Sequence, residues 1–296
     1  MDINQIITDK IINLLERGTF KTSARWTGNK STGLPVNAKT GEPYHGINVL
    51  VLWAEIAEKS YASSQWLTYK QAADMGANVR KGEKSVMCVC YGTVGKRNES
   101  QADEEQETYF MAKPFWLFNV AQIDGLSLDL ATAINAEPCG SFNPHQEAEQ
   151  LLVNSKASIN YGFDSAYYSP SADKICLPAR ERFTSESNFY ATALHELSHW
   201  TGSEMRLNRS FGKRFGDDAY AFEELVAELG AAFTVGQLGM IDTTIEAHAD
   251  YVQSWIKVLK NDKTAILKAA SLASKAANFI LSRSAGNSKV ATSTVN

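Results

Sequence analysis

Apolar residues recur with helical spacing in some stretches of the first half and alternate residue by residue in others, which predicts both helices and strands. Helices are predicted at 1–18, 48–60 and 67–76. Strands are predicted at 85–94 and 107–120, and the acidic segment NESQADEEQET (98–108) between them predicts a hairpin loop. The first half is therefore expected to be an α+β unit.

The second half is predicted to be mainly helical, with a small β-sheet. A strand hairpin is expected over 166–183, followed by a helix that begins near Thr184 or Ser185. Further helices are expected at 217–239 and, as a pair broken near Asn261–Asp262, within 249–281. The fold class is therefore expected to be α+β, with this division: a first domain at 1–130, a linker at 131–145, a second domain at 146–283 and a disordered polar tail at 284–296.

The composition is that of a soluble globular protein, with 44% hydrophobic and 21% charged residues. The chain has no run of about 18 apolar residues that would predict a membrane span, and its first residues do not have the pattern of a signal peptide. The four cysteines have neither disulfide-like nor zinc-ribbon spacing, and Cys88 and Cys90 are expected on opposite faces of a strand. We expect a cytoplasmic protein with reduced thiols and no membrane partner.

Positive charge is concentrated in the first third of the chain, although the net charge is -4. Residues 1–98 contain 13 Lys and Arg against 8 Asp and Glu. Composition alone favours an ordinary solvated surface for this segment, and a polyanionic partner would also fit it.

The stretch HELSHWTG (195–202) places two histidines four positions apart on a predicted helix. Residues at i and i+4 share a helix face, so His195 and His199 can both direct imidazole nitrogens at one metal ion. Glu196 lies close enough on the same helix to act as a general base on a water molecule. Two nitrogen ligands, an open position and a carboxylate base are the arrangement of a zinc hydrolase. The alternative is a core helix whose histidines bind no metal.

A third protein ligand is predicted on the helix at 217–239. The longer pattern HExxHxxGxxH is excluded because Met205 occupies the position of its third histidine. Glu224 and Glu228 lie one turn apart on an otherwise apolar helix, where an unpaired charge would be costly. We expect Glu224 to be the third ligand and Glu228 to accept a hydrogen bond from a ligand histidine, while Glu223 is expected on the surface. Zn²⁺ is the expected metal, although such ligands also accept Mn²⁺ or Co²⁺.

Three further features leave alternatives open. Residues 175–177 are a candidate edge strand for pairing with a substrate backbone, and an ordinary core hairpin explains them equally well. Tyr167 or Tyr168 is a candidate for stabilising an oxyanion, although no pattern selects either one. Five lysines of the last helices form either a basic face or, as we favour, a solvated surface: Lys257, Lys260, Lys263, Lys268 and Lys275.

Aromatic and basic residues are interleaved in the first domain. A sequence-tolerant binder of single-stranded nucleic acid needs both, because cations contact phosphates and ring faces stack on bases. The sequence contains neither a phosphate-cradling GxxxxGK[ST] loop nor a polymerase-like carboxylate pair. The candidate DNA-binding residues are Arg25, Trp26, Lys30, Lys39, Tyr44, Trp66, Tyr69, Lys70, Arg80, Lys81 and Lys84.

Two sets of motifs resemble a known family, the ArdC-type antirestriction proteins. The stretches that resemble its N-terminal domain are LPVNAKTGEPYHGINVLVLW (34–53), WLTYKQAADMGANVRKGEKS (66–85) and FNVAQIDGL (118–126). Those that resemble its zincin-like metallopeptidase domain are ICLPARERF, HELSHWTG, RLNR (206–209) and EELVAELGAAF (223–233). The resemblance covers nearly the whole chain.

The resemblance implies a protein of a plasmid or another mobile element that binds single-stranded DNA and protects incoming DNA from host restriction. It also implies that His195, His199 and Glu224 are metal ligands and that Glu196 is catalytic. A host restriction subunit or another DNA-bound protein is a candidate partner. Three alternatives stay open: a DNA-binding module with a structural metal, a DNA-dependent protease of protein–DNA adducts, and a priming accessory factor.

Overall fold

The computed structural model describes residues 2–16, 33–95, 108–126, 145–211, 218–240 and 249–284. The expected linker and tail, the hairpin loop and the candidate DNA-binding residues Arg25, Trp26 and Lys30 lie outside these ranges, apart from a few residues at their ends. None of the described helices is both long enough and apolar enough to cross a bilayer.

The first part of the chain is built on a four-stranded sheet. Its strands lie in the order β1 (Val36–Asn37), β2 (Gln65–Leu67), β5 (Thr108–Asn119) and β4 (Val86–Gly95). The long antiparallel pair of β4 and β5 confirms the predicted hairpin strands. Cys88 is buried and Cys90 is exposed. Residues two apart on a strand share a face, so alternation does not explain this difference, and the expectation of opposite faces is corrected.

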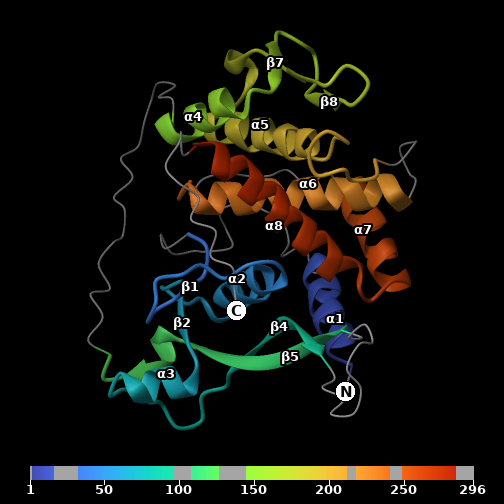
Figure 1. The fold of residues 1–296 in the computed structure, drawn as a ribbon. Helices are drawn as coiled ribbons and strands as arrows, with labels where there is room; N and C mark the ends of the chain where they lie inside the picture. Colours follow the sequence, from blue (N-terminus) through green and yellow to red (C-terminus); the bar gives the residue numbers. More distant parts are fainter. Residues whose placement is uncertain are drawn as a thin grey trace, which may run out of the picture.

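Helices lie on both sides of this sheet (Figure 1). The predicted first two helices are α1 (Ile3–Glu16) and α2 (Ile47–Lys59), and α2 packs on β4. The short helix α3 (Tyr69–Asp74) starts at a capping box formed by Thr68 and Gln71. It covers the other face of the sheet together with the small pair of β3 (Asn78–Val79) and β6 (Ile123–Asp124).

The second part is a stack of helices below a three-stranded sheet (Figure 1). Its helices are α4 (Gln146–Ser155), α5 (Glu186–Thr201), α6 (Asp218–Gln237), α7 (Ala249–Asn261) and α8 (Ala265–Ser284). The helix α5 begins after Ser185, whose Oγ accepts a hydrogen bond from the backbone NH of Asn188, as the sequence predicts. The break between α7 and α8 also falls where it is predicted.

The small sheet decides between the two alternatives for residues 175–177, in favour of a hairpin packed into the core. Its strands lie in the order β7 (Ser158–Tyr161), β9 (Lys174–Leu177) and β8 (Tyr167–Ser169). Residues 175–177 therefore belong to the central strand, hydrogen-bonded on both sides and buried, and they have no free edge for a substrate. The exposed edges of this sheet belong to β7 and β8.

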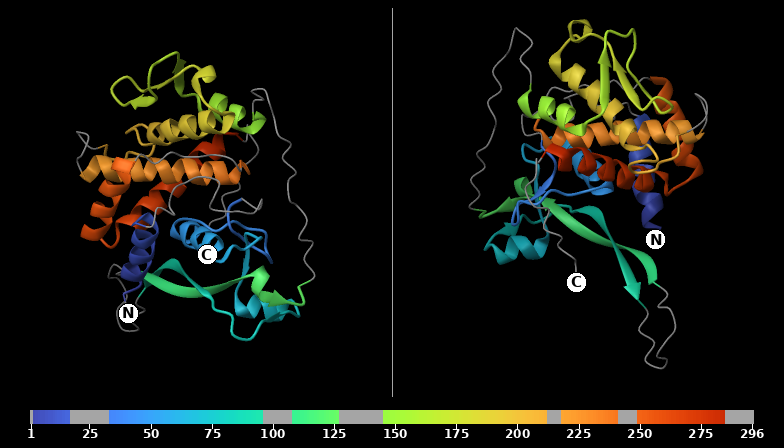
Figure 2. Two further views of the ribbon diagram at one scale, coloured as in Figure 1. Left: turned by 180° about the vertical axis from the view of Figure 1, so that it is seen from behind. Right: turned by 45° about the horizontal axis from the view of Figure 1, so that its top comes forward.

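The two parts share one hydrophobic core. Its buried residues come from both parts and include Ile11, Leu50, Leu52, Leu117, Leu225, Trp255 and Ile266. Trp53 of α2 lies against Phe233 of α6, with ring centroids 6.0 Å apart, and Thr8 Oγ1 donates to the backbone oxygen of Lys263 at 2.7 Å. In both views of Figure 2 the β4–β5 hairpin and the small sheet lie at opposite ends of the molecule, with α6 and α8 between them.

Candidate metal centre and nucleic-acid surface

Helices α5 and α6 bring the three predicted ligands together. The Nε2 atoms of His195 and His199 lie 3.1 Å apart. The two carboxylate oxygens of Glu224 lie 3.5 Å from these nitrogens, one from each. The candidate ligand atoms of the three residues all lie within 4.8 Å of one another.

The other ring nitrogen of each histidine faces a carboxylate. His195 Nδ1 lies 3.2 Å from Glu228, the residue that the helix spacing predicts. His199 Nδ1 lies 3.2 Å from Glu223. A carboxylate on Nδ1 holds that nitrogen protonated and leaves the lone pair of Nε2 for a metal.

Glu223 is not the surface residue that we expected. Its exposed fraction is 3%, because its carboxylate lies between His199 and the guanidinium of Arg209. The helical period places Glu223 next to the candidate ligand Glu224. It does not explain why α6 can bury a third carboxylate besides Glu224 and Glu228; the buried Arg209, 14 positions earlier in the chain, does.

The electrostatics of the cluster favour a cation. Burial lowers the pKa of His195, but hydrogen bonds to Glu224 and Glu228 outweigh burial and raise that pKa well above its ordinary value. Burial raises the pKa of Glu224, but the two histidines outweigh it and lower that pKa far below its ordinary range. Positive charge is thus stabilised at the point where the donor atoms converge.

The donor set fits a catalytic divalent metal site. Two imidazole nitrogens and one carboxylate oxygen are the protein ligands of many catalytic zinc sites, which keep one position open. Glu196 follows His195 directly on α5 and is 7% exposed. The site therefore contains a buried carboxylate that is not one of the three candidate ligands.

The rim of the metal centre is aromatic on the side of β8. The Phe211 ring lies 6.4 Å from that of His199 and 5.9 Å from that of Tyr168. The hydroxyl of Tyr168 donates to Asp173 at 2.8 Å and accepts from Arg206 at 3.2 Å. Burial and Asp173 raise the pKa of Tyr168 to about 12.

The described candidates for DNA binding fall into two groups. Trp66 is completely buried in the core, so its indole cannot stack on a base, and this prediction is corrected. Tyr44 is half-buried beside the core, and burial raises its pKa to about 12.

The basic candidates differ in whether they already have acidic partners. Lys39 pairs with Asp74, and the Arg80 guanidinium contacts two carboxylates and a backbone oxygen. The exposed candidates without an ion pair in the described part are Lys70, Lys81 and Lys84, with the exposed ring of Tyr69.

Trp116 is one of the aromatic residues interleaved with basic ones in the first domain, but the candidate DNA-binding residues did not include it. It is 52% exposed on β5, and Tyr69 is 65% exposed. Phe118, two positions after Trp116 on the same face of β5, has its ring centroid 6.4 Å from that of Tyr69. The sequence feature that could have identified Trp116 is the two-residue period of β5: Leu117 is buried, so its neighbours Trp116 and Phe118 face the opposite side of the sheet.

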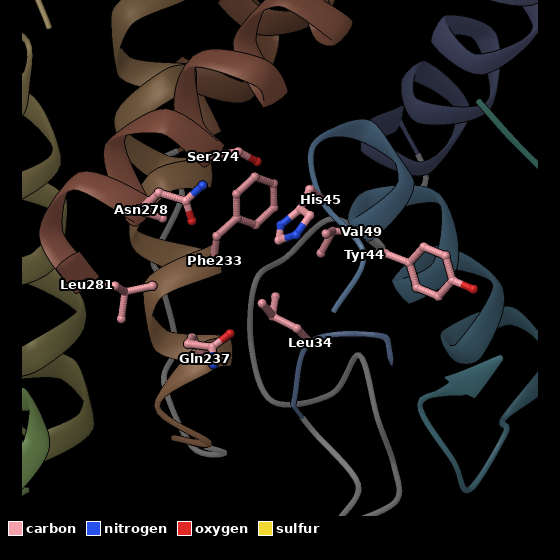
Figure 3. Close-up of a pocket in the computed structure, with 10 residues that line it drawn as sticks. Leu34, Tyr44, His45, Val49, Phe233, Gln237, Ser274, Asn278 and Leu281 are labelled. Carbon is pink, nitrogen blue, oxygen red and sulfur yellow. The ribbon is translucent and has the colours of Figure 1, made fainter. Parts of the chain in front are cut away.

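A separate cleft lies where the two parts meet. It encloses about 310 Å³, a volume that includes open solvent, between the β1–α2 segment and helices α6 and α8. Figure 3 shows the ring of His45 beside that of Phe233, with the amide of Asn278 across the cleft. None of the residues of the metal cluster lines it.

The last-helix lysines form no free basic face. Four of the five have acidic partners: Lys257 with Asp218, Lys260 with Glu16, Lys263 with Asp2, and Lys268 with Asp262. These pairs agree with the favoured prediction of a solvated surface.

The fold and the histidine–glutamate site are those of a zincin-like metallopeptidase joined to a second unit. Residues 146–272 match the model of a zincin-like metallopeptidase family, and residues 1–118 match that of the N-terminal domain of anti-restriction factor ArdC. The crystal structure of the metal-free antirestriction protein ArdC of plasmid R388 is similar over 96% of this chain and 98% of that one, with a TM-score of 0.81 and 38% identity. The Mn(II)-bound structure of the same protein is similar with a TM-score of 0.78 and 37% identity, over 96% of this chain and 99% of that one. The chain belongs to the ArdC family of antirestriction proteins.

The curated relatives are of two kinds: one protein that this chain covers almost completely and two much longer primases. The uncharacterized protein y4eC of Sinorhizobium fredii is 32% identical, over 94% of this chain and 91% of that protein. Two DNA primases TraC of Escherichia coli are 36% and 37% identical over 94% and 93% of this chain. The chain spans only 20% and 26% of the length of these primases.

Proposed function

We propose that this antirestriction protein binds single-stranded DNA through its first part and hydrolyses a protein bound to the same DNA at its metal centre, protecting incoming plasmid DNA from host restriction. The observation that carries the proposal is the burial of Glu196 beside the converging donors His195, His199 and Glu224. A purely structural metal needs ligands but no additional carboxylate.

The residues of the centre have distinct roles in this proposal. His195 and His199 would hold the metal through Nε2, and Glu224 through its carboxylate. A divalent metal, when bound there, polarises a peptide carbonyl and makes a water molecule more acidic. Glu196 takes the proton of the attacking water and returns it to the leaving amide nitrogen. Zn²⁺ is the proposed metal; the Mn(II)-bound relative supports Mn²⁺ as a second, and Co²⁺ suits the same donors.

The edge of the small sheet suits an extended substrate. Strand β8 is an edge strand that contacts α5, and the ring of its residue Tyr168 lies beside that of Phe211, which in turn lies beside that of His199. An extended peptide can therefore pair with β8 and reach the metal centre. Tyr168 is held by Asp173 and Arg206, so it shapes the rim in this proposal rather than stabilising an oxyanion.

The exposed rings of the first part suit single-stranded DNA. The exposed rings of Trp116 and Tyr69 and the partly buried ring of Phe118 form a row on one face of the sheet and of α3, and Lys70 follows Tyr69 in the chain. Ring faces give sequence-tolerant stacking on bases, and lysines neutralise phosphates. We propose this row as the DNA-contacting surface of the described part.

The peptidase half is tested with the variant Glu196→Gln, which keeps the side-chain shape and removes the base. Plasmid transfer into a restricting host is compared with wild type, after metal content and DNA affinity are shown to be unchanged. Loss of protection, together with a host protein that wild type alone cleaves, supports hydrolysis. Full protection by Glu196→Gln would show that the metal is structural for this function and that DNA binding carries it.

The DNA half is tested with Trp116→Ala and Tyr69→Ala in fluorescence titrations with a labelled oligonucleotide. Each loss of a stacked base should cost about 1–3 kcal/mol of binding free energy. The matched control is Tyr161→Ala, because Tyr161 is a comparably exposed ring (46%) on the other part of the molecule. Unchanged affinity in both variants would place the DNA elsewhere on the protein.

A further inference from the structure

Arg209 belongs to neither ligand helix, yet its side chain is buried at the metal centre. Its exposed fraction is 8%, and among the residues that the structure describes it is the one buried lysine or arginine. It follows α5 by eight positions, in the stretch RLNR. Burial of a guanidinium is costly unless every donor is used.

The donors of Arg209 are used on both ligand helices. Nη2 and Nε donate to the two carboxylate oxygens of Glu223 on α6, at 2.7 and 3.0 Å. Nη1 donates to Thr201 Oγ1 at 2.8 Å, and Nη2 also donates to the backbone oxygen of Ser198 at 2.7 Å, both on α5. One side chain therefore ties the helix of the histidines to the helix of the glutamates.

The Glu223 oxygen that accepts from Arg209 also faces Nδ1 of His199, at 3.2 Å. We propose that Arg209 is a positioning residue of the metal centre: it holds the carboxylate of Glu223 against His199, and so orients Nε2 of His199 toward the metal. The planar fork of arginine fits a carboxylate with two parallel hydrogen bonds, which a lysine cannot make.

The charges of the cluster explain why a cation is placed there. Four buried carboxylates surround the two histidines: Glu196, Glu223, Glu224 and Glu228. A divalent metal balances two negative charges, and Arg209 balances a third. Without Arg209, the carboxylate of Glu223 would be buried without the partner that contacts both of its oxygens.

The two histidines are supported unequally. Glu228 supports His195 with one oxygen, and its other oxygen, Oε1, has no hydrogen-bond partner in the described part. Glu223 is fixed by the fork of Arg209. The carboxylate that faces the ring of His199 is thus held from the segment 202–211, whereas in the described part no hydrogen bond from this segment reaches Glu228, which faces the ring of His195.

Gly202 allows this segment to fold back. A Cβ atom at this position would lie 2.9 Å from Arg209 Nη2 and 2.7 Å from Phe211 Cζ, closer than real Cβ contacts. The glycine of HELSHWTG and the last arginine of RLNR therefore act together, and both belong to the metal motif.

The inference is tested by metal binding, with Zn²⁺ and Co²⁺ as probes. Affinity for Zn²⁺ is measured by competition with a chromophoric chelator, and the visible spectrum of the Co²⁺ protein reports ligand geometry. Arg209→Gln should weaken Zn²⁺ binding on the order of 10- to 100-fold, the usual effect of losing an outer partner of a ligand, and should alter the Co²⁺ spectrum. Arg209→Lys, which keeps the charge, should restore only part of the affinity.

Two controls separate positioning from folding. Arg206→Gln removes an arginine that also donates to α5, at the backbone oxygen of Trp200, but touches no carboxylate of the metal cluster. Its Zn²⁺ affinity should equal that of wild type. In a double-mutant cycle, Glu223→Gln should cost little further affinity once Arg209→Gln is present, because the two residues act in series.

Three results would overturn the inference: unchanged Zn²⁺ affinity in Arg209→Gln, equal weakening in Arg206→Gln, or additive effects in the cycle. If Arg209→Gln does not fold, the same comparison is made with Arg209→Lys, for which unchanged affinity is the contrary result. The inference rests on the metal-binding part of the proposed function. Because the experiment measures metal binding, its result does not depend on whether the protein hydrolyses a substrate.

Discussion

Gly230 lies where the two helices that carry the candidate metal ligands approach each other closely. A Cβ atom at this position of α6 would lie 2.9 Å from Ser198 Oγ and 3.3 Å from Ser198 Cβ, on α5. The Ser198 hydroxyl cannot easily move away, because it donates to the backbone oxygen of Leu194 at 2.8 Å. The substitution Gly230→Ala should therefore push α5 and α6 apart by a few tenths of an ångström.

Two effects of opposite sign decide the stability of Gly230→Ala. Overpacking a core contact costs roughly 1–3 kcal/mol, whereas alanine in a helix interior gains about 1 kcal/mol over glycine. The net expectation is a loss of up to about 2 kcal/mol, or several degrees of Tm in a chain of this size. Because α5 carries His195 and His199 and α6 carries Glu224, the affinity for Zn²⁺ should fall as well.

The substitution Gly236→Ala is the matched control on the same helix. A Cβ atom there would lie 3.1 Å from the Trp53 ring and 3.3 Å from Leu34, at the contact with the first part of the molecule rather than with α5. Urea unfolding of the metal-free proteins should show both variants destabilised, and chelator competition should show weaker Zn²⁺ binding only for Gly230→Ala. A Gly230→Ala protein that is more stable than wild type and binds Zn²⁺ equally well would refute the reasoning, because helix propensity would then outweigh the contact.

Three further predictions concern stability. Trp66→Ala should lower the free energy of unfolding by about 3–5 kcal/mol and leave the DNA affinity of the folded protein unchanged in titrations. Removing the metal with a chelator should lower Tm, by an amount that corresponds to about 2.7 kcal/mol when free metal was at 100 times Kd. Burial raises the pKa of Glu149, but hydrogen bonds from Arg180 and Tyr190 outweigh it and leave that pKa lowered. The resulting stabilisation is present above about pH 4.3 and is lost as the pH falls through the lower folded-state pKa. Urea unfolding should therefore show wild type more stable than Glu149→Gln at pH 7, by a margin that shrinks steadily as the pH is lowered below about 4.3.

The elements of the fold and the metal motif could be predicted because their signals are local. Helical spacing placed His195 and His199 on one face, and the apolar surroundings of Glu224 and Glu228 marked two carboxylates that needed a partner. Glu223 was misassigned because its partner, Arg209, comes from a segment without helical or strand periodicity. Trp66 was misassigned because a tryptophan among lysines looks the same in sequence whether its strand position faces the core or the solvent.

Helix α6 explains why the two parts of the chain form one structure. One side of this helix carries Glu223, Glu224 and Glu228 toward the histidines of α5. Its other side contributes Leu225, Val226 and Phe233 to the same hydrophobic core as α1 and α2 of the first part. Because α6 is buried, with acidic residues on one side and apolar residues on the other, other elements must cover both of its sides. The first part of the chain therefore forms the support of the helix that carries the candidate metal ligand Glu224.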